Sequence, residues 1–282
     1  MRNALQANRN IVSDDARLIE DALEVSIEAA REAASVIRES SGALDKLEWV
    51  EKASADFVTE VDRGAESAIT ATIKAAFRNA VIVGEELTPD KTLKSTGLTF
   101  IVDPLDGTTN FLHGFPHFSV SIAVMHRTDL VAAVVLNVPR GDLFTASSGN
   151  GTRLNGEIVR VSSIDSTSRA LIGTGFPFKN PDLLETYAKQ FVEISRHTAG
   201  IRRAGSAALD LADVACGRFD GFWELVLAPW DVAAGIVLVR EAGGIVTDIS
   251  GSPAKAAHGA YIAGNPFLHP WLVQAVQKAS NN

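Results

Sequence analysis

The chain has 282 residues, 46% hydrophobic and 21% charged, which excludes a disordered chain, a collagen-like repeat and a coiled coil. Its 26 basic and 34 acidic side chains give a net charge of −8, so we expect neither direct nucleic-acid binding nor attachment to an anionic membrane. The single Cys216 excludes an internal disulfide, and without a secretion signal or an apolar run of ~18 residues the expected location is the cytoplasm.

The first part of the chain predicts two helices followed by short strands. Apolar residues recur at helical spacing over residues 13–40, with Ser13 as the N-cap and frayed residues before it, and again over residues 62–77. Residues 81–83 and 98–102 are predicted strands, and each runs directly into acidic residues. Acids therefore gather at strand ends.

The rest of the chain predicts a layered α/β fold. Gly-, Pro- and Asn-containing turns separate predicted antiparallel strands over residues 119–125, 130–138, 143–146 and 158–161. Strands then alternate with helices. The strands are predicted at residues 170–174, 220–225, 245–248 and 261–263, and the helices at residues 181–196, 206–216, 231–241 and 266–279.

The most informative acidic segment is DPLDGTTN, residues 103–110. Pro104 biases Asp103 toward an extended conformation and blocks direct entry into a helix, so Asp103 and Asp106 can point into one concavity across a tight turn. Converging carboxylates must share protons or bind a cation, and an all-oxygen set favours Mg²⁺ over zinc. Gly107 and the following N–H groups suit a phosphate, so the segment indicates phosphoryl chemistry.

Each acidic segment also has an ordinary structural interpretation. An isolated Asp-Gly is usually a turn, and Asp231 or Asp62 alone is more often the start of a helix. Residues 84–86, GEE, would usually be an exposed acidic loop. Lys52 either meets a phosphate or is solvated, in a segment that we expect to be a mobile loop.

Together and in this order, these motifs resemble the inositol monophosphatase family of Mg²⁺-dependent, lithium-sensitive phosphatases. The resemblance runs from about Glu51 to the C-terminal helix, through DFVTEVD at 56–62, GEE at 84–86, DPLDGTTNF at 103–111, GSAALD at 205–210 and WDVAAG at 230–235. Residues 173–179 and 202–206 resemble the bacterial extragenic-suppressor (SuhB-like) branch. Relatives acting on 3′-phosphonucleotides carry Lys-Glu-Phe, and histidinol-phosphate phosphatases often carry Arg, where this chain has Thr109-Asn110-Phe111.

The resemblance implies an α/β fold, an αβαβα sandwich of the inositol monophosphatase and fructose-1,6-bisphosphatase type. Residues 1–282 would form one catalytic unit. Residues 1–165 would carry the antiparallel sheet and most metal ligands, and residues 166–282 would form an α/β half with the substrate-binding residues. Family members are commonly homodimers, and bacterial relatives also act in transcription through protein partners.

The resemblance also assigns roles residue by residue. Two Mg²⁺ ions are implied, with a weaker third near Glu85 left open: the ligands of the first are Glu85, Asp103 and the carbonyl of Leu105, and those of the second are Asp103, Asp106 and Asp231. Thr108 and Glu85, with Asp62 behind Thr108, orient the attacking water, and Gly107 and Thr108 hold the phosphate. The substrate-binding residues are Gly205, Ser206, Ala207, Glu224 and Thr174.

These residues lead to inositol-1-monophosphate hydrolysis as the expected activity, and two alternatives stay open. One keeps the metal centre but takes fructose 1,6-bisphosphate, histidinol phosphate or a 3′-phosphonucleotide. The other is a regulatory protein that binds the transcription machinery.

Overall fold

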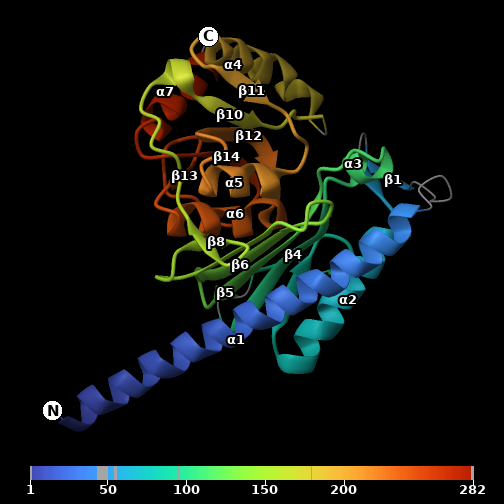
Figure 1. Ribbon diagram of the computed structural model, residues 1–282, viewed down its shortest axis with the longest axis vertical. Coiled ribbons are helices and arrows are strands. Elements are labelled where there is room, and N and C mark those ends of the chain that lie inside the picture. Colours follow the sequence, from blue (N-terminus) through green and yellow to red (C-terminus); the bar gives the residue numbers. More distant parts are fainter. Residues whose placement is uncertain are drawn as a thin grey trace.

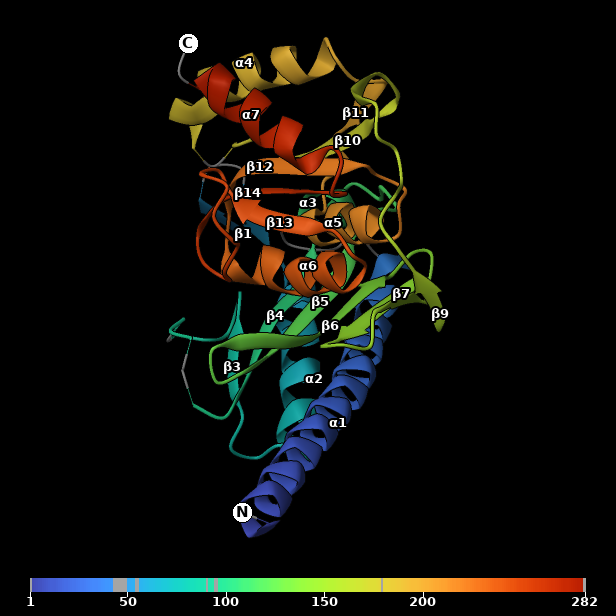
Figure 2. The ribbon, with the colours of Figure 1, turned by 90° about the vertical axis from the view of Figure 1, so that its left-hand side faces the viewer.

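The computed structural model describes residues 2–42, 50–53, 56–89, 91–93, 96–178 and 180–280, without the side chains of residues 2–14, 50–53 and 56–58. Helix pairs and sheets alternate in five layers, so the predicted αβαβα sandwich is confirmed (Figures 1 and 2). None of the described helices combines the length and the apolar character needed to cross a bilayer.

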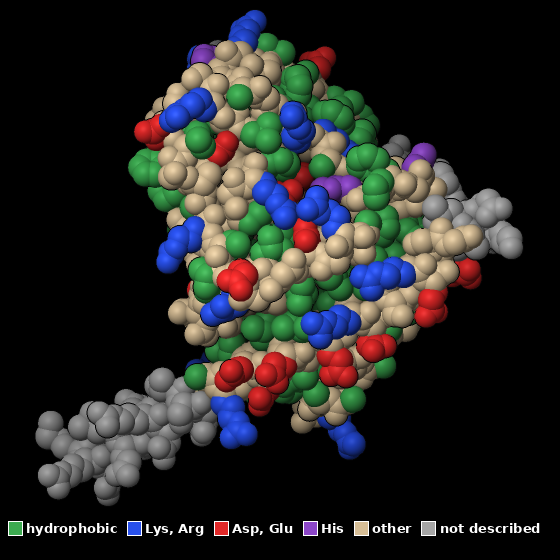
Figure 3. Space-filling model, viewed as in Figure 1, with side chains coloured by type: hydrophobic (Ala, Val, Ile, Leu, Met, Phe, Trp, Pro, Cys, Tyr) green, Lys and Arg blue, Asp and Glu red, His purple; other side chains and the backbone are tan. Residues whose placement is uncertain are grey.

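The first layer consists of α1 (Arg2–Ser40) and α2 (Glu60–Ala76), which pack together on one face of the larger sheet. The prediction that α1 begins at Ser13 is wrong, because no Gly or Pro interrupts residues 2–40 and the helix continues back to Arg2. Its buried face is mainly alanine, including Ala22, Ala30 and Ala34, which lets the helix backbone approach the sheet closely. Its outer face is acidic (Figure 3).

In the described part of the chain, seven strands form the larger sheet in chain order, with β3 parallel to β4 and every other pair antiparallel. The strands are β3 (Val81–Gly84), β4 (Leu98–Asp106), β5 (Ser119–His126), β6 (Asp129–Asn137), β7 (Leu143–Ser147), β8 (Thr152–Leu154) and β9 (Glu157–Val159). The sequence did not predict β8, because three residues are too few to show an alternating pattern.

Strands β1 (Val50–Ala53) and β2 (Asp56–Val58) pair where the sequence predicted a loop. The side chains of Lys52 and Asp56 lie outside the described residues, as does the whole of Lys179.

Five described strands form the second sheet, in the order β11-β10-β12-β14-β13, with β10 parallel to β11 and β12 and the remaining pairs antiparallel. They are β10 (Leu171–Thr174), β11 (Gly200–Arg202), β12 (Gly221–Leu227), β13 (Ile245–Asp248) and β14 (Gly259–Gly264). Helices α5 (Ala207–Ala215) and α6 (Pro229–Glu241) fill the space between the sheets, and α4 (Leu184–Ser195) and α7 (His269–Ser280) cover the outer face.

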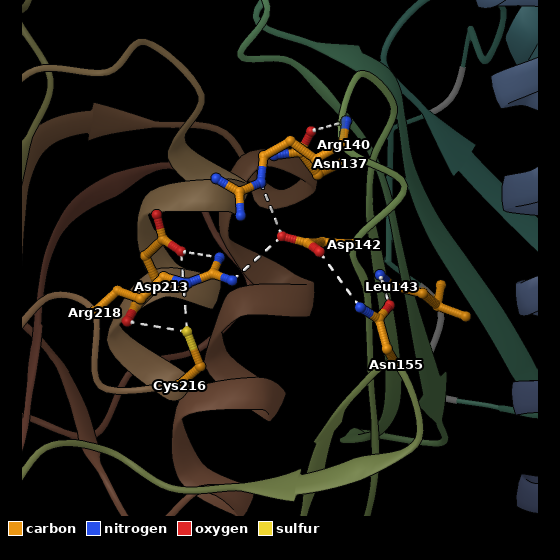
Figure 4. A network of polar contacts seen from close by, with 8 residues as sticks. All are labelled: Asn137, Arg140, Asp142, Leu143, Asn155, Asp213, Cys216 and Arg218. Atoms are coloured by element: carbon orange, nitrogen blue, oxygen red, sulfur yellow. Dashed lines mark hydrogen bonds and ion pairs between the residues drawn. The ribbon is translucent and has the colours of Figure 1, made fainter.

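A polar network ties α5 to the larger sheet (Figure 4). The Arg218 guanidinium donates to Asp213 Oδ1 at 2.9 Å and to Asp142 Oδ2 at 3.2 Å, and Asp142 also accepts from Arg140 Nε at 3.0 Å.

Cys216 Sγ points back to the Asp213 carbonyl oxygen at 3.6 Å, and burial raises the pKa of this thiol. Cys216 is therefore a packing residue with little thiolate character.

The contact between α5 and α6 depends on Gly235. A Cβ at this position would lie 2.6 Å from Leu211 Cβ, closer than real carbon atoms approach. The absence of a side chain lets the two helices pack tightly, and the same helix α6 carries Asp231 in its first turn.

We expect Gly235→Ala to lower the free energy of unfolding by about 1–3 kcal/mol, because overpacking outweighs the better helix propensity of alanine, worth ~1 kcal/mol. Urea unfolding measures the change. Gly259→Ala is the matched control, because no atom lies within 4 Å of a Cβ built there. Equal stability of both variants and the wild type would contradict this account of the helix contact.

Candidate active site

A bulge in β4 brings the two acids of the DPLD segment to one face of the sheet. Asp103 pairs with Ser121 and Asp106 with Ser119, so three steps along β4 match two along β5. Residues three apart normally face opposite sides of a strand, and one extra residue reverses this. The prediction of a tight turn after Val102 is therefore wrong: the strand continues to Asp106, and Pro104, which lacks an N–H, sits within the bulge.

A cavity of about 450 Å³ opens between the two sheets at this end of β4. Every proposed site residue except Asp62 lines it. The lining residues include Glu85, Asp103, Leu105, Asp106, Gly107, Thr108, Thr174, Gly205, Ser206, Ala207, Glu224 and Asp231. Residues more than 140 positions apart in the sequence, such as Glu85 and Asp231, therefore line the same cavity.

Asp62 lies directly behind Thr108 and is 1% exposed. Its Oδ1 accepts a hydrogen bond from Thr108 Oγ1 at 3.0 Å, and its Oδ2 accepts from the Thr59 N–H at 2.8 Å and the Thr59 hydroxyl at 2.6 Å. Asp62 therefore caps the start of α2 and also accepts a hydrogen bond from the Thr108 hydroxyl, so the structural interpretation is confirmed and the catalytic one stays a prediction.

The N-terminus of α5 holds Asp106. Its Oδ2 accepts from Ser206 Oγ at 2.5 Å and from the Ala208 N–H at 2.9 Å. Ser206 is also the N-cap of the helix and accepts from the Leu209 N–H at 3.3 Å. The positive end of the helix dipole and these donors partly offset the cost of burying the carboxylate, although burial still raises the pKa of Asp106.

Asp231 occupies the first turn of α6 rather than the N-cap position. The helix begins at Pro229, two residues earlier than predicted, because proline favours the first helical position. Asp231 Oδ2 accepts from the Ala228 N–H at 2.7 Å. Asp231 therefore caps the first turn of α6, and the same helix places this residue in the wall of the cavity.

Glu85 is positioned by a buried acid that the sequence interpretation missed. Glu66 on α2 is fully buried, and its carboxylate accepts from the Glu86 N–H at 2.6 Å and the Leu87 N–H at 3.0 Å. Lys91 Nζ donates to the Glu85 carbonyl oxygen at 2.7 Å and lies 4.8 Å from the centre of the Trp230 ring. The available signal was an acid four residues after Asp62, on the apolar face of α2.

Two glycines with positive φ let the α3 (Thr108–Leu112) and α5 segments approach each other. Gly107 has φ 96° and Gly205 has φ 95°. A Cβ on Gly107 would lie 3.1 Å from the Gly205 carbonyl oxygen. Asn110 Nδ2 joins the same segments by donating to the carbonyl oxygens of His117 at 2.7 Å and Ala204 at 2.9 Å.

At the far end of the cavity, Glu224 on β12 packs against Gly175. Thr174 is fully buried, and its hydroxyl donates to Tyr187 Oη at 3.3 Å. Burial raises the pKa of Tyr187 to about 12, and Glu224 adds to the shift. Arg203 lies near the rim over the rings of Phe176 and Phe178, at 5.3 Å and 4.7 Å.

Burial and mutual repulsion of the carboxylates make this cavity a candidate cation site. Burial, followed by the charges of Glu85, Asp106 and Asp231, holds the pKa of the Asp103 carboxyl well above its usual range. Within the described chain, no three acidic, cysteine or histidine side chains close around one point, so binding requires the carboxylates to turn inward. The donors are hard oxygens at the ends of rigid elements, and this set fits a magnesium-type ion.

Comparison with known proteins agrees with this geometry. Residues 18–281 match the model of the inositol monophosphatase family. A Nus factor SuhB from Pseudomonas aeruginosa is 46% identical over 261 residues, which cover 90% of this chain and 95% of the relative.

Two solved structures are also similar. An extragenic suppressor protein SuhB from Bartonella henselae gives a TM-score of 0.85 at 40% identity and covers 92% of this chain and 99% of its own. An IMPase from Thermotoga maritima gives a TM-score of 0.84 at 34% identity, with coverage of 93% and 98%.

Fold and site therefore define a protein of a phosphatase family whose members are generally Mg²⁺-dependent. The chain belongs to the inositol monophosphatase family, and its relatives place it in the SuhB-like branch.

We expect Asp103→Asn to stabilise the protein in EDTA at neutral pH by about 1–2 kcal/mol, because it removes one of several buried like charges. In the folded protein, the raised pKa means that ionised Asp103 is destabilised relative to its protonated form. The advantage of the variant should therefore shrink as the pH falls through that pKa. Thermal unfolding across pH measures the effect.

Mg²⁺ should reverse the order, because it binds the folded wild type and raises its melting temperature more than that of the variant. Asp165→Asn serves as the control, since Asp165 is exposed and forms its ion pair with the neighbouring Arg169. A variant less stable than the wild type in EDTA at neutral pH would show that the carboxylates do not oppose one another.

Proposed function

We propose that this protein is a Mg²⁺-dependent phosphomonoester hydrolase acting on inositol monophosphates. The observation that carries the proposal is the convergence of Glu85, Asp103, Asp106 and Asp231 on one cavity beside the α3 N-terminus. Glu85, Asp103 and the Leu105 carbonyl would hold one ion, and Asp103, Asp106 and Asp231 a second, with Glu85 available to a third. Bound Mg²⁺ would supply an acidified water ligand and neutralise charge on the phosphate and leaving oxygen.

The protein's own groups would orient the nucleophile and the phosphate. Thr108 Oγ1 has one proton and two acceptors within reach, Asp62 Oδ1 at 3.0 Å and the Leu105 carbonyl oxygen at 3.1 Å. Donation to either one leaves a lone pair of Oγ1 to accept a hydrogen bond from the attacking water. The N–H groups of Gly107 and Thr108 precede the first full turn of α3 and have no acceptor within that helix, so they are suited to phosphate oxygens. Attack by water requires no phosphoenzyme.

The leaving group would occupy the far end of the cavity. Ser206, Ala207, Gly205, Glu224 and Thr174 surround that space, and their polar groups suit the hydroxyls of a polyol. Asn110 supports inositol monophosphates over nucleotides, because it closes the α3–α5 contact where nucleotide-specific relatives carry a charged residue. The solved IMPase relative supports the same choice.

Hydrolysis of myo-inositol 1-phosphate should require Mg²⁺, stop in EDTA and be inhibited by Li⁺. Asp231→Asn should lower kcat/KM by roughly a hundredfold or more, since even outer ligand contacts change activity by ~10–100-fold. Phosphate release measures both effects, with Asp165→Asn as the control. Full activity of Asp231→Asn or in EDTA would refute the metal mechanism. Faster turnover of fructose 1,6-bisphosphate, histidinol phosphate or a 3′-phosphonucleotide would refute the substrate assignment.

The resemblance extends the proposal in three ways. Residues 1–282 would act as one catalytic unit with halves meeting near residue 165, the protein would be a homodimer, and it would work in the cytoplasm. The exposed Phe178, Leu184 and Val192 on the α4 side supply apolar surface of the kind that subunit contacts use.

A second function is supported by the Nus factor name of the 46%-identical relative. In this proposal the protein binds the transcription machinery and needs no turnover. RNA polymerase or its elongation factors should then co-purify with an inactive Asp106→Asn variant at near-physiological salt. Recovery of no such partner with either the wild type or the variant would remove this candidate.

A further inference from the structure

Asp210 is a buried acid in the cavity to which none of the roles above applies. It lies one helical turn beyond Ser206 on α5 and is 1% exposed. Its Oδ1 is buried and has no hydrogen-bond partner among the described residues, although Asp210 lines the cavity. Burying a carboxylate without a partner costs free energy, so an acid at this position needs an explanation beyond packing.

The surroundings of Asp210 indicate what would satisfy it. The charges of Glu224 and Asp106 oppose ionisation of Asp210. This end of the cavity therefore carries several acids, which would repel a second phosphate. Arg203 also acts on it and already supplies a positive charge near the rim. A neutral hydroxyl can donate a hydrogen bond to the Asp210 carboxyl without bringing a further charge into the cavity.

We propose that Asp210 is a specificity-determining residue that accepts a hydrogen bond from a hydroxyl of the leaving polyol. This inference rests on the proposed function and adds a contact to the hydroxyl-facing residues already named. Ser206 and Asp210 share one face of α5. The helix therefore holds Asp106 through Ser206 and, one turn further on, presents Asp210 to the leaving group.

The test compares myo-inositol 1-phosphate with its monodeoxy analogues in the wild type, Asp210→Asn and Asp210→Ala. In the wild type, removing the contacted hydroxyl should lower kcat/KM by about ten- to a hundredfold, as expected for a hydrogen bond to a charged group. Asp210→Ala should abolish the penalty for that one analogue. The penalties for the other analogues should stay. The lower kcat/KM of Asp210→Ala with myo-inositol 1-phosphate should come mainly from a higher KM.

Asp213→Asn is the matched control, because it makes the same change on the same helix but at a side chain that pairs with Arg218 outside the cavity (Figure 4). The charge of Asp213 also acts on Asp210, but this side chain does not reach the cavity, so the variant should keep the differences between the analogues. Asp210→Asn should unfold at or above the wild-type temperature, since it replaces a buried carboxyl that the neighbouring acids oppose and whose Oδ1 has no partner among the described residues. It therefore provides the selectivity measurement even if Asp210→Ala fails to fold.

The outcomes separate this inference from the proposed function. Turnover by the wild type with the same analogue penalties in both Asp210 variants would overturn the inference alone. Absence of any Mg²⁺-dependent turnover by the wild type would overturn the proposed function and the inference with it. A wild-type preference for the aminodeoxy analogue that disappears in Asp210→Asn would overturn the inference in favour of a cation subsite.

Discussion

Repulsion among buried carboxylates is the constraint on which the rest of the site depends. Asp103 lies within the electrostatic reach of Glu85, Asp106 and Asp231, and it is only 2% exposed. The fold tolerates this cluster because three of the acids accept hydrogen bonds: Asp103 from the Leu105 N–H, Asp106 from the start of α5 and Asp231 from the Ala228 N–H. These contacts keep the acids in place without neutralising them, so a cation is the natural complement.

The helices of the middle layer determine which acids can meet. Helix α6 reaches the cavity because Gly235, with no side chain, lets it pack on α5, and Pro229 sets its start so that Asp231 falls in the first turn. The bulge in β4 provides the opposing pair of acids from the larger sheet. The packing of α6 on α5 therefore also determines where Asp231 lies. A change in the α5–α6 spacing would move Asp231 away from Asp103.

The sequence predicted the long periodic elements well because burial imposes a regular pattern on them. Most strands and all the second-half helices appear within a few residues of their predicted bounds. β11 escaped prediction because its three residues are exposed or only partly buried and are too few to show an alternating pattern. The motifs located the acids, but the supporting roles of Glu66 and Asp210 depend on burial that arises only when distant segments pack.

The two ends of the cavity come from different parts of the chain, and this has consequences for specificity. The larger sheet, α3 and the start of α6 would supply the proposed metal and phosphate end, whereas β10, β12 and the segment before α5 would supply the proposed leaving-group end. Side chains such as Thr174 and Glu224 could therefore change without moving a proposed metal ligand. Ser206 is the exception, since its hydroxyl caps α5 and binds Asp106. Substitution there would alter recognition and metal binding together, so substrate range has more freedom to vary at Asp210 and Glu224 than at the helix start.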